Sequence, residues 1–290
     1  MTALALGLTL AVGASLALNG SYLLQHAGSA GLPAVDARHP LRTMGGLLTA
    51  PLWAGGLVLG MTGWALHVAA LTRAPLSLVQ AFVAGGLALT VPAARRWLGR
   101  AIGGAEALAV AGMALALVAL TMGVATGPVR GEPGALAAVA FLVPAAALPA
   151  ALGLLGARLG RFDLLAAAGG ALYGAADLAI KVLTGVYTAG GLAGVAGSAW
   201  LPIAAVLTAG AFFAFQRSLQ GASPVTAIAL MTAGTYVTSI VGGLVLLDDP
   251  LGSGTALSLV HAAALAVVVG AAWLLSRSQA ELALAPEVAA

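Results

Sequence analysis

The chain has 290 residues, of which 61% are hydrophobic and only 7% are charged, and its mean hydropathy is +1.06. A soluble domain carries about 25% charged residues, so this composition excludes a soluble globular protein and predicts an integral membrane protein. The formal net charge of +3 provides no basic surface of the kind that binds nucleic acid, and the absence of cysteine excludes disulfides and thiolate metal sites.

Apolar segments long enough to cross a bilayer as helices recur along the whole chain. Pro144 and Pro149 lie inside one of them and predict a kink in that helix. The sequence therefore predicts an all-α, polytopic membrane helix bundle embedded in the lipid bilayer. We place nine spans, at residues 3–25, 45–71, 75–94, 103–123, 134–156, 163–184, 198–216, 223–247 and 254–276.

The basic residues test this number of spans, because alternate loops of a polytopic protein lie on the same side. With nine spans, one side carries Arg73 and Arg130, and Lys181 stays inside a span. The positive-inside rule then places the C-terminus in the cytoplasm and the N-terminus outside. Eleven arginines against one lysine, with abundant Ala and Gly, suggest a GC-rich bacterium and its plasma membrane. The other side carries nine arginines: Arg38, Arg42, Arg95, Arg96, Arg100, Arg158, Arg161, Arg217 and Arg277.

Two stretches of the chain indicate an internal repeat. "LTRAPLSLVQAFVAGGLAL" and "LQGASPVTAIALMTAGTYV" share a proline and a glycine at an offset of 149 residues, since Pro75 matches Pro224 and Gly85 matches Gly234. A shift of five spans reverses the direction through the membrane, so the halves form an inverted repeat, as in many secondary transporters. The predicted divisions are a first half at 1–125, a kinked linking helix at 126–158, a second half at 159–277 and a disordered cytoplasmic tail at 278–290.

Both stretches resemble the drug/metabolite transporter superfamily, in which a proline at the helix start, a glycine in mid-helix and a charged turn recur in each half. The turns here read "ARRWLGR" and "LLDDP", where EamA-type members usually carry a glutamate. Nine spans and a first helix ending in "YLLQHAG" look more like the NIPA-like branch, which is linked to magnesium transport. The resemblance implies transport without ATP hydrolysis and without a cofactor, around a central cavity.

Two charges interrupt the apolar sixth span in the stretch "YGAADLAIK". Gly170, Gly174, Asp177 and Lys181 are three or four residues apart, so they share one helix face, which Tyr173 flanks. Either charge alone would cost at least about 2.5 kcal/mol inside a bilayer, whereas a pair at i and i+4 would be neutral. The face therefore predicts a substrate or coupling-ion site; the alternative is a purely structural pair, with Lys181 snorkelling to the interface.

Other polar residues inside the spans could line the same cavity. The strongest of these candidates are His67, Gln80, Gln216 and Tyr236, with Gln216 matching His67 in the repeat. The alternative is a hydrogen bond between helices, worth about 0.6 kcal/mol on average. Gly85, Gly170, Gly174 and Gly234 are predicted to allow close helix packing. Weaker candidates for the cavity are Asn19, Gln25, His26, Thr235 and His261.

These features together favour secondary transport of a small metabolite or drug-like solute by alternating access. Zinc-protease, Walker and nucleophile-elbow motifs are all absent, so the sequence does not predict an enzyme or an ATP-driven pump. Magnesium transport is an alternative in which Asp177 supplies the one carboxylate deep in the membrane. A non-transporting scaffold or lipid-handling partner is another alternative, and assembly as a homodimer is compatible with the sequence.

Overall fold

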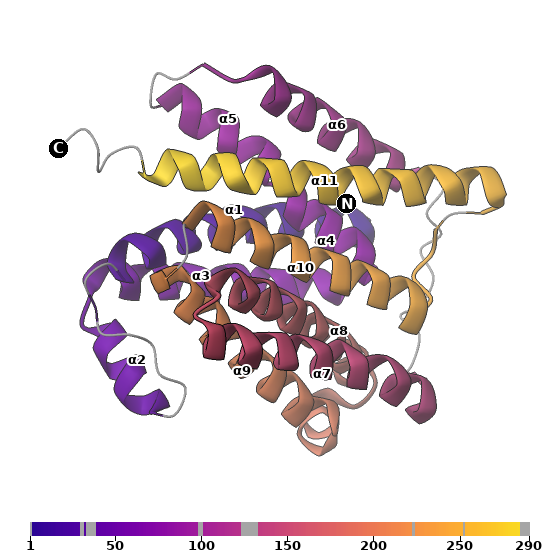
Figure 1. The fold of residues 1–290 in the computed structure, drawn as a ribbon. Helices are drawn as coiled ribbons and strands as arrows, with labels where there is room; N and C mark the ends of the chain where they lie inside the picture. Colours follow the sequence, from indigo (N-terminus) through magenta and orange to yellow (C-terminus); the bar gives the residue numbers. More distant parts are fainter. Residues whose placement is uncertain are drawn as a thin grey trace.

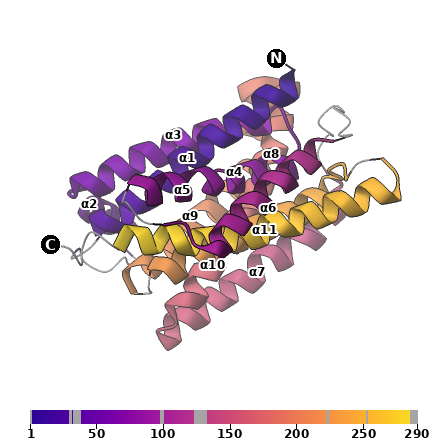
Figure 2. The same ribbon diagram turned by 90° about the horizontal axis from the view of Figure 1, so that it is seen from above.

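The computed structural model describes residues 2–29, 32, 39–97, 101–122, 133–221, 224–251 and 253–284. Within these ranges every regular element is an α-helix, and the long helices run side by side as one bundle (Figures 1 and 2). The helices are α1 (Ala3–Ser29), α2 (Pro40–Leu48), α3 (Pro51–Leu71), α4 (Leu76–Gly85), α5 (Leu87–Trp97), α6 (Gly104–Thr121), α7 (Ala135–Leu159), α8 (Phe162–Gly197), α9 (Trp200–Gly221), α10 (Pro224–Leu246) and α11 (Thr255–Leu284).

Eight of the described helices are long and apolar enough to cross a membrane, namely α1, α3, α6, α7, α8, α9, α10 and α11. They coincide with eight of the nine predicted spans, and the all-helical, multi-pass membrane architecture is confirmed. The remaining predicted span, at 75–94, is divided into the short helices α4 and α5.

A side chain from another helix explains why α4 ends where it does. The hydroxyl of Ser15 on α1 donates a hydrogen bond to the carbonyl oxygen of Val83, an acceptor that a continuous helix would use for its own backbone. Ser15 fits there because it lies directly against Gly86, where any side chain would collide with it. Pro92 further weakens the helix after the break, since it lacks an N–H. The interruption therefore results from packing as much as from local sequence.

Two other helices differ from the predicted spans, whereas α7 matches its span and stays helical through Pro144 and Pro149. α8 continues past the predicted end at residue 184 and is interrupted at Gly191, whose φ of 61° suits glycine. The segment predicted to be disordered from residue 278 is helical as far as Leu284, because its Ala, Glu and Leu residues favour helix. Residues 285–290 lie outside the described part of the chain.

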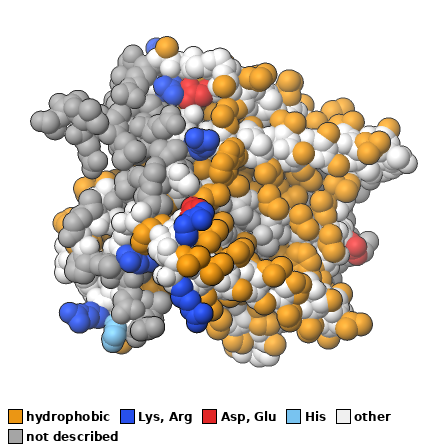
Figure 3. Space-filling model, viewed as in Figure 1, with side chains coloured by type: hydrophobic (Ala, Val, Ile, Leu, Met, Phe, Trp, Pro, Cys, Tyr) orange, Lys and Arg blue, Asp and Glu red, His pale blue; other side chains and the backbone are white. Residues whose placement is uncertain are grey.

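The surface is apolar over much of the bundle, as a bilayer-embedded protein requires. Figure 3 shows hydrophobic side chains across the face in view, and Lys and Arg side chains concentrated toward the end of the molecule where α11 ends. Leu108, Leu115, Leu136 and Val206 are each more than 70% exposed. An apolar surface of this extent is expected where helices face lipid hydrocarbon.

Candidate functional site

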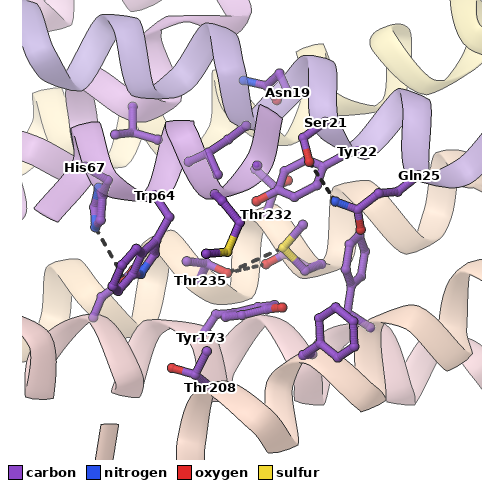
Figure 4. Close-up of a pocket in the computed structure, with 18 of the residues that line it drawn as sticks. Asn19, Ser21, Tyr22, Gln25, Trp64, His67, Tyr173, Thr208, Thr232 and Thr235 are labelled. Atoms are coloured by element: carbon purple, nitrogen blue, oxygen red, sulfur yellow. Dashed lines mark hydrogen bonds and ion pairs between the residues drawn. The ribbon is translucent and has the colours of Figure 1, made fainter. Parts of the chain in front are cut away.

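A cavity of about 380 Å³ lies between two groups of helices and is lined by several of the polar residues of the spans (Figure 4). Six helices line it: α1, α3 and α4 from the first part of the chain, and α8, α9 and α10 from the second. The lining combines aromatic rings and aliphatic side chains with a few polar groups, a composition that is typical of small-molecule sites.

Asp177 on α8 is at the centre of the polar contacts in this cavity. Its Oδ2 accepts a hydrogen bond of 2.6 Å from the Nε2 of Gln80, and the Ser239 hydroxyl lies 3.4 Å from the same oxygen. Its Oδ1 lies 3.4 Å from the Nε2 of His67, whose side chain is only 5% exposed. Neither ring nitrogen of His67 has a hydrogen-bond partner among the described residues. The ring nitrogens of His67 therefore remain able to form hydrogen bonds with a bound solute.

Close packing of α8 on α10 places the carboxylate there. A Cβ on Gly170 would collide with the backbone of Met231, and one on Gly174 would lie 2.6 Å from the carbonyl oxygen of Thr235. Gly234 on α10 approaches the α8 backbone in the same way. The absence of side chains lets the two backbones meet, and the face that carries Gly170 and Gly174 also carries Asp177 one turn further on.

His67 and Gln80 reach Asp177 from the two sides of the turn between α3 and α4. His67 lies in the last full turn of α3 and Gln80 in the second turn of α4. Pro75 is the residue that precedes the first turn of α4, where its missing N–H is harmless. The sharp connection therefore brings two polar side chains, thirteen positions apart in sequence, to one carboxylate.

Aromatic rings form much of the remaining cavity wall. Tyr22, Tyr173 and Tyr236 come from α1, α8 and α10 and all line the cavity, and each is within electrostatic range of Asp177. Tyr22 packs edge-on against Phe215, with ring centroids 5.6 Å apart. Figure 4 shows Tyr22 and Tyr173 on opposite sides of the cavity. An anionic group surrounded by aromatic rings is an arrangement that attracts organic cations.

A chain of amides closes the cavity toward the end where α1 terminates. Gln216 on α9 donates to Gln25 on α1 at 2.5 Å, and Gln25 donates to the hydroxyl of Ser21 at 2.7 Å. The indole of Trp53 on α3 donates to Gln216 at 3.4 Å. These buried bonds join α1, α3 and α9, so they link the first part of the chain to the second.

Lys181 does not pair with Asp177, although the i, i+4 spacing suggested this. Its ammonium group donates to the carbonyl oxygens of Leu71 at 2.6 Å and Ala74 at 2.7 Å, and the residue is 5% exposed. Lys181 therefore caps the end of α3, where orphaned carbonyls and the helix dipole favour a cation. Among the described residues no ion pair joins it to Asp177, and it does not snorkel to the interface.

Asp249 binds the other side of the turn between α3 and α4. Its Oδ2 accepts the backbone N–H of Ser77 at 2.6 Å, in the first turn of α4. Burial raises the pKa of Asp249 above its ordinary value, while the Ser77 hydrogen bond and the charge of Lys181 act in the opposite direction. We call the contacts of Lys181 and Asp249 with residues 71–77 the turn clamp.

The structure brings six of the seven predicted binding residues to this one cavity: His67, Gln80, Tyr173, Asp177, Gln216 and Tyr236. The seventh, Lys181, lies one helical turn away in the turn clamp. The glycines predicted for helix packing all make tight approaches, with Gly85 facing Leu117 of α6.

The weaker candidates separate into two groups. Asn19, Gln25 and Thr235 line the cavity, whereas His261 lies 3.0 Å from the carbonyl oxygen of Met122, at the contact of α11 with the end of α6. The side chain of His26 lies outside the described part of the structure. Sequence reasoning missed Tyr22 and Trp64, although each lies three residues from a polar residue on the same face, Asn19 or His67.

Comparison with protein-family models, with curated proteins and with solved structures found no match to this chain.

Proposed function

We propose that this protein is a secondary transporter that moves a small organic solute across the membrane by alternating access. The observation that carries the proposal is the Asp177 carboxylate, held by His67 and Gln80 in a cavity between two groups of helices. A charged residue deep in a membrane protein is costly to maintain and is typically part of a substrate or ion pathway. The resemblance to drug/metabolite transporters points in the same direction.

The arrangement of the helices supports two related halves with nine spans, if α4 and α5 together make one crossing. α1 packs on α3 as α8 packs on α9, and α1 packs on α4 as α8 packs on α10. Between the halves, α4 meets α10 and α6 meets α11. Exchanging the two sets of helices leaves these contacts unchanged. Such symmetry is expected of an inverted repeat whose site lies at the interface between the halves.

The charge in the cavity favours a cationic solute. Among the lining residues, all of them in the described part of the chain, Asp177 is the one carboxylate and there is no Lys or Arg. The aromatic rings add attraction for an organic cation and leave apolar surface for its body. Magnesium binds through one or two carboxylates and retained waters, which the aromatic and aliphatic lining around Asp177 complements less well than it complements an organic cation.

The experiment is solute uptake into proteoliposomes that contain the purified protein. Amino acids, nucleobases, polyamines, quaternary amines and Mg²⁺ would be tested with wild type, Asp177→Asn and Asp248→Asn. Asp248 is an exposed aspartate in the turn after α10, so it is a matched control for loss of one carboxylate. We expect one class of cation to be taken up by wild type and the control, and uptake to fall at least about tenfold in Asp177→Asn.

Three outcomes would contradict the proposal. Uptake of no solute by wild type would favour a non-transporting membrane partner. Equal uptake by wild type and Asp177→Asn would remove Asp177 from the pathway. Uptake of Mg²⁺ alone, lost in Asp177→Asn, would replace the organic cation with the metal ion.

A further inference from the structure

A second hollow lies beside the central cavity and differs from it in chemistry. This groove, of about 870 Å³, runs between α3, α8 and α9 and is lined by residues such as Val68, Ile180, Leu183, Leu192 and Phe213. Nearly all of its lining is aliphatic or aromatic. We call it the side groove.

The side groove adjoins the cavity that holds Asp177. Trp64, Thr208 and Phe212 line both hollows, so these three side chains form the wall that they share and that a ligand spanning both would have to displace. Figure 4 shows Trp64 and Thr208 within the cavity. The side groove borders the cavity from between α3, α8 and α9.

The mouth of the side groove faces the bilayer. Leu192 is 78% exposed and Tyr187 is 51% exposed, and both belong to its lining. Val206, one residue from the lining residue Ala205 on α9, is 71% exposed. Because α3, α8 and α9 are all long and apolar enough to cross the membrane, the medium beside this mouth is lipid hydrocarbon.

We propose that the side groove holds the hydrocarbon chain of a single-chain amphiphile whose cationic headgroup lies against Asp177, and that such molecules enter the cavity laterally from the bilayer. This inference rests on the proposed function, because it names the class of solute that the same cavity would take. The chain would lie against the apolar walls, and the headgroup would pass Trp64 into the ring of Tyr22, Tyr173 and Tyr236.

Charge decides which amphiphile fits. An ordinary phospholipid would bring its phosphate toward Asp177, with no Lys or Arg in the lining to accept it. A fatty acid would bring a second carboxylate to the first. A quaternary or primary ammonium group instead complements Asp177 and the aromatic faces around it. The hydrocarbon chain explains the second, apolar hollow, which a small polar cation would leave unused.

Trp64 provides a direct probe, because it stands where headgroup and chain would meet. Full-length protein would be reconstituted in nanodiscs and titrated with a long-chain alkyltrimethylammonium that carries bromine on its chain, which quenches indole fluorescence on contact. The signal due to Trp64 is the difference between wild type and Trp64→Phe. The matched ligands are the brominated fatty acid of equal chain length, compared at equal concentration in the membrane, and tetramethylammonium as a competitor without a chain.

We expect the brominated cation to quench the Trp64 signal in a saturable manner. The brominated fatty acid should give only the non-saturable quenching that comes from chains in the surrounding membrane. Asp177→Asn should weaken the apparent affinity at least about tenfold. Ala205→Phe, which fills the side groove, should weaken it similarly, whereas the neighbouring exposed Val206→Phe should not. Tetramethylammonium has no chain to occupy the side groove. It should therefore compete with the brominated cation, with an apparent affinity that is the same in wild type and in Ala205→Phe.

Equal quenching by cation and fatty acid would overturn the proposal, and so would equal behaviour of Ala205→Phe and Val206→Phe. The uptake experiment tests the proposed function independently of this binding experiment. If the cation binds as expected but proteoliposomes show no uptake, transport is refuted and the binding site stands. If small cations are transported but the brominated chain never quenches Trp64, the side groove is not the route.

Discussion

Asp177 and Lys181 lie one helical turn apart on α8, yet they act on different parts of the molecule. Asp177 faces the cavity with Gln80 and His67, while Lys181 caps carbonyl oxygens at the end of α3. A lysine with buried backbone acceptors gains strong charge-assisted hydrogen bonds and no longer requires the aspartate. Among the described residues no Lys or Arg pairs with the Asp177 carboxylate, which leaves it available to a cationic solute.

The sequence could identify the polar residues of this site but not the partners of each. Polar side chains inside apolar spans avoid lipid, so His67, Gln80 and Asp177 were expected to face inward. The bonds of Lys181 depend on where another helix ends, and spacing along α8 carries no information about that. Tyr22 and Trp64 were missed because aromatic residues are common in spans, and only the fold shows which of them face a cavity.

Asp249 gives a prediction on the pH dependence of stability. Its pKa is raised in the folded state, so its contribution to stability is fully present below the unfolded value of about 4 and decreases as pH rises through the folded value. Asp249→Asn removes this titration. We therefore expect wild type to gain stability relative to the variant as pH falls from 7 toward about 4.

The measurement is the difference in thermal unfolding temperature between the two proteins across that pH range. Asp248→Asn is the control, since Asp248 is exposed and its φ of 50° also suits asparagine. A difference that is independent of pH, or the same trend in Asp248→Asn, would show that the Asp249 carboxyl does not titrate as proposed.

At the scale of helices, glycine positions determine how closely α8 and α10 approach. Gly170→Ala places a methyl group against the backbone of Met231, which cannot move aside as a flexible side chain could. Alanine improves helix propensity by up to about 1 kcal/mol, but overpacking of this kind costs about 1–3 kcal/mol. We expect a net loss of stability and a displaced Asp177.

Gly190→Ala provides the matched control, because no atom lies within 4 Å of a Cβ at that position of α8. Both variants would be compared by thermal unfolding and by solute uptake. Gly190→Ala should be neutral or slightly stabilising in both assays. If Gly170→Ala behaves in the same way, the contact between α8 and α10 is looser than the structure indicates.

Hydropathy predicted the helix positions for eight of the nine spans, but it did not predict the break in the remaining span, at 75–94. The break between α4 and α5 depends on Ser15, which lies 68 residues away from Val83 in the sequence and donates to its carbonyl. Residues 75–94 alone form a continuous apolar segment with two glycines and two prolines, and none of these four residues requires a break at this point. Long-range packing of this kind is absent from any local pattern.

At the scale of the whole molecule, the orientation in the membrane is a further prediction. The arginine distribution places the α2 end in the cytoplasm and the turn between α10 and α11 outside. The native chain has no cysteine, so single-cysteine variants report accessibility without background. Leu41→Cys and Ser253→Cys suit this purpose, since both positions are exposed.

A membrane-impermeant thiol reagent applied to intact cells should label Ser253→Cys and leave Leu41→Cys unlabelled. Permeabilised cells should show labelling of both variants, which confirms that each site is reactive. Labelling of Leu41→Cys alone in intact cells would show the opposite orientation. Labelling of both variants would put the two sites on the same side and reject the predicted number of crossings.

The turn clamp lies one helical turn from the Asp177 site along both α4 and α8. Ser77 and Gln80 are one turn apart on α4, and Lys181 and Asp177 are one turn apart on α8. Gln80 donates directly to Asp177, whereas the clamp reaches residues 71–77 from α8 through Lys181 and from the turn after α10 through Asp249. A solute that takes the place of Gln80 would remove the hydrogen bond between α4 and α8 and leave the clamp to hold the start of α4. Binding would therefore act on the connection between α3 and α4 through contacts only one turn away.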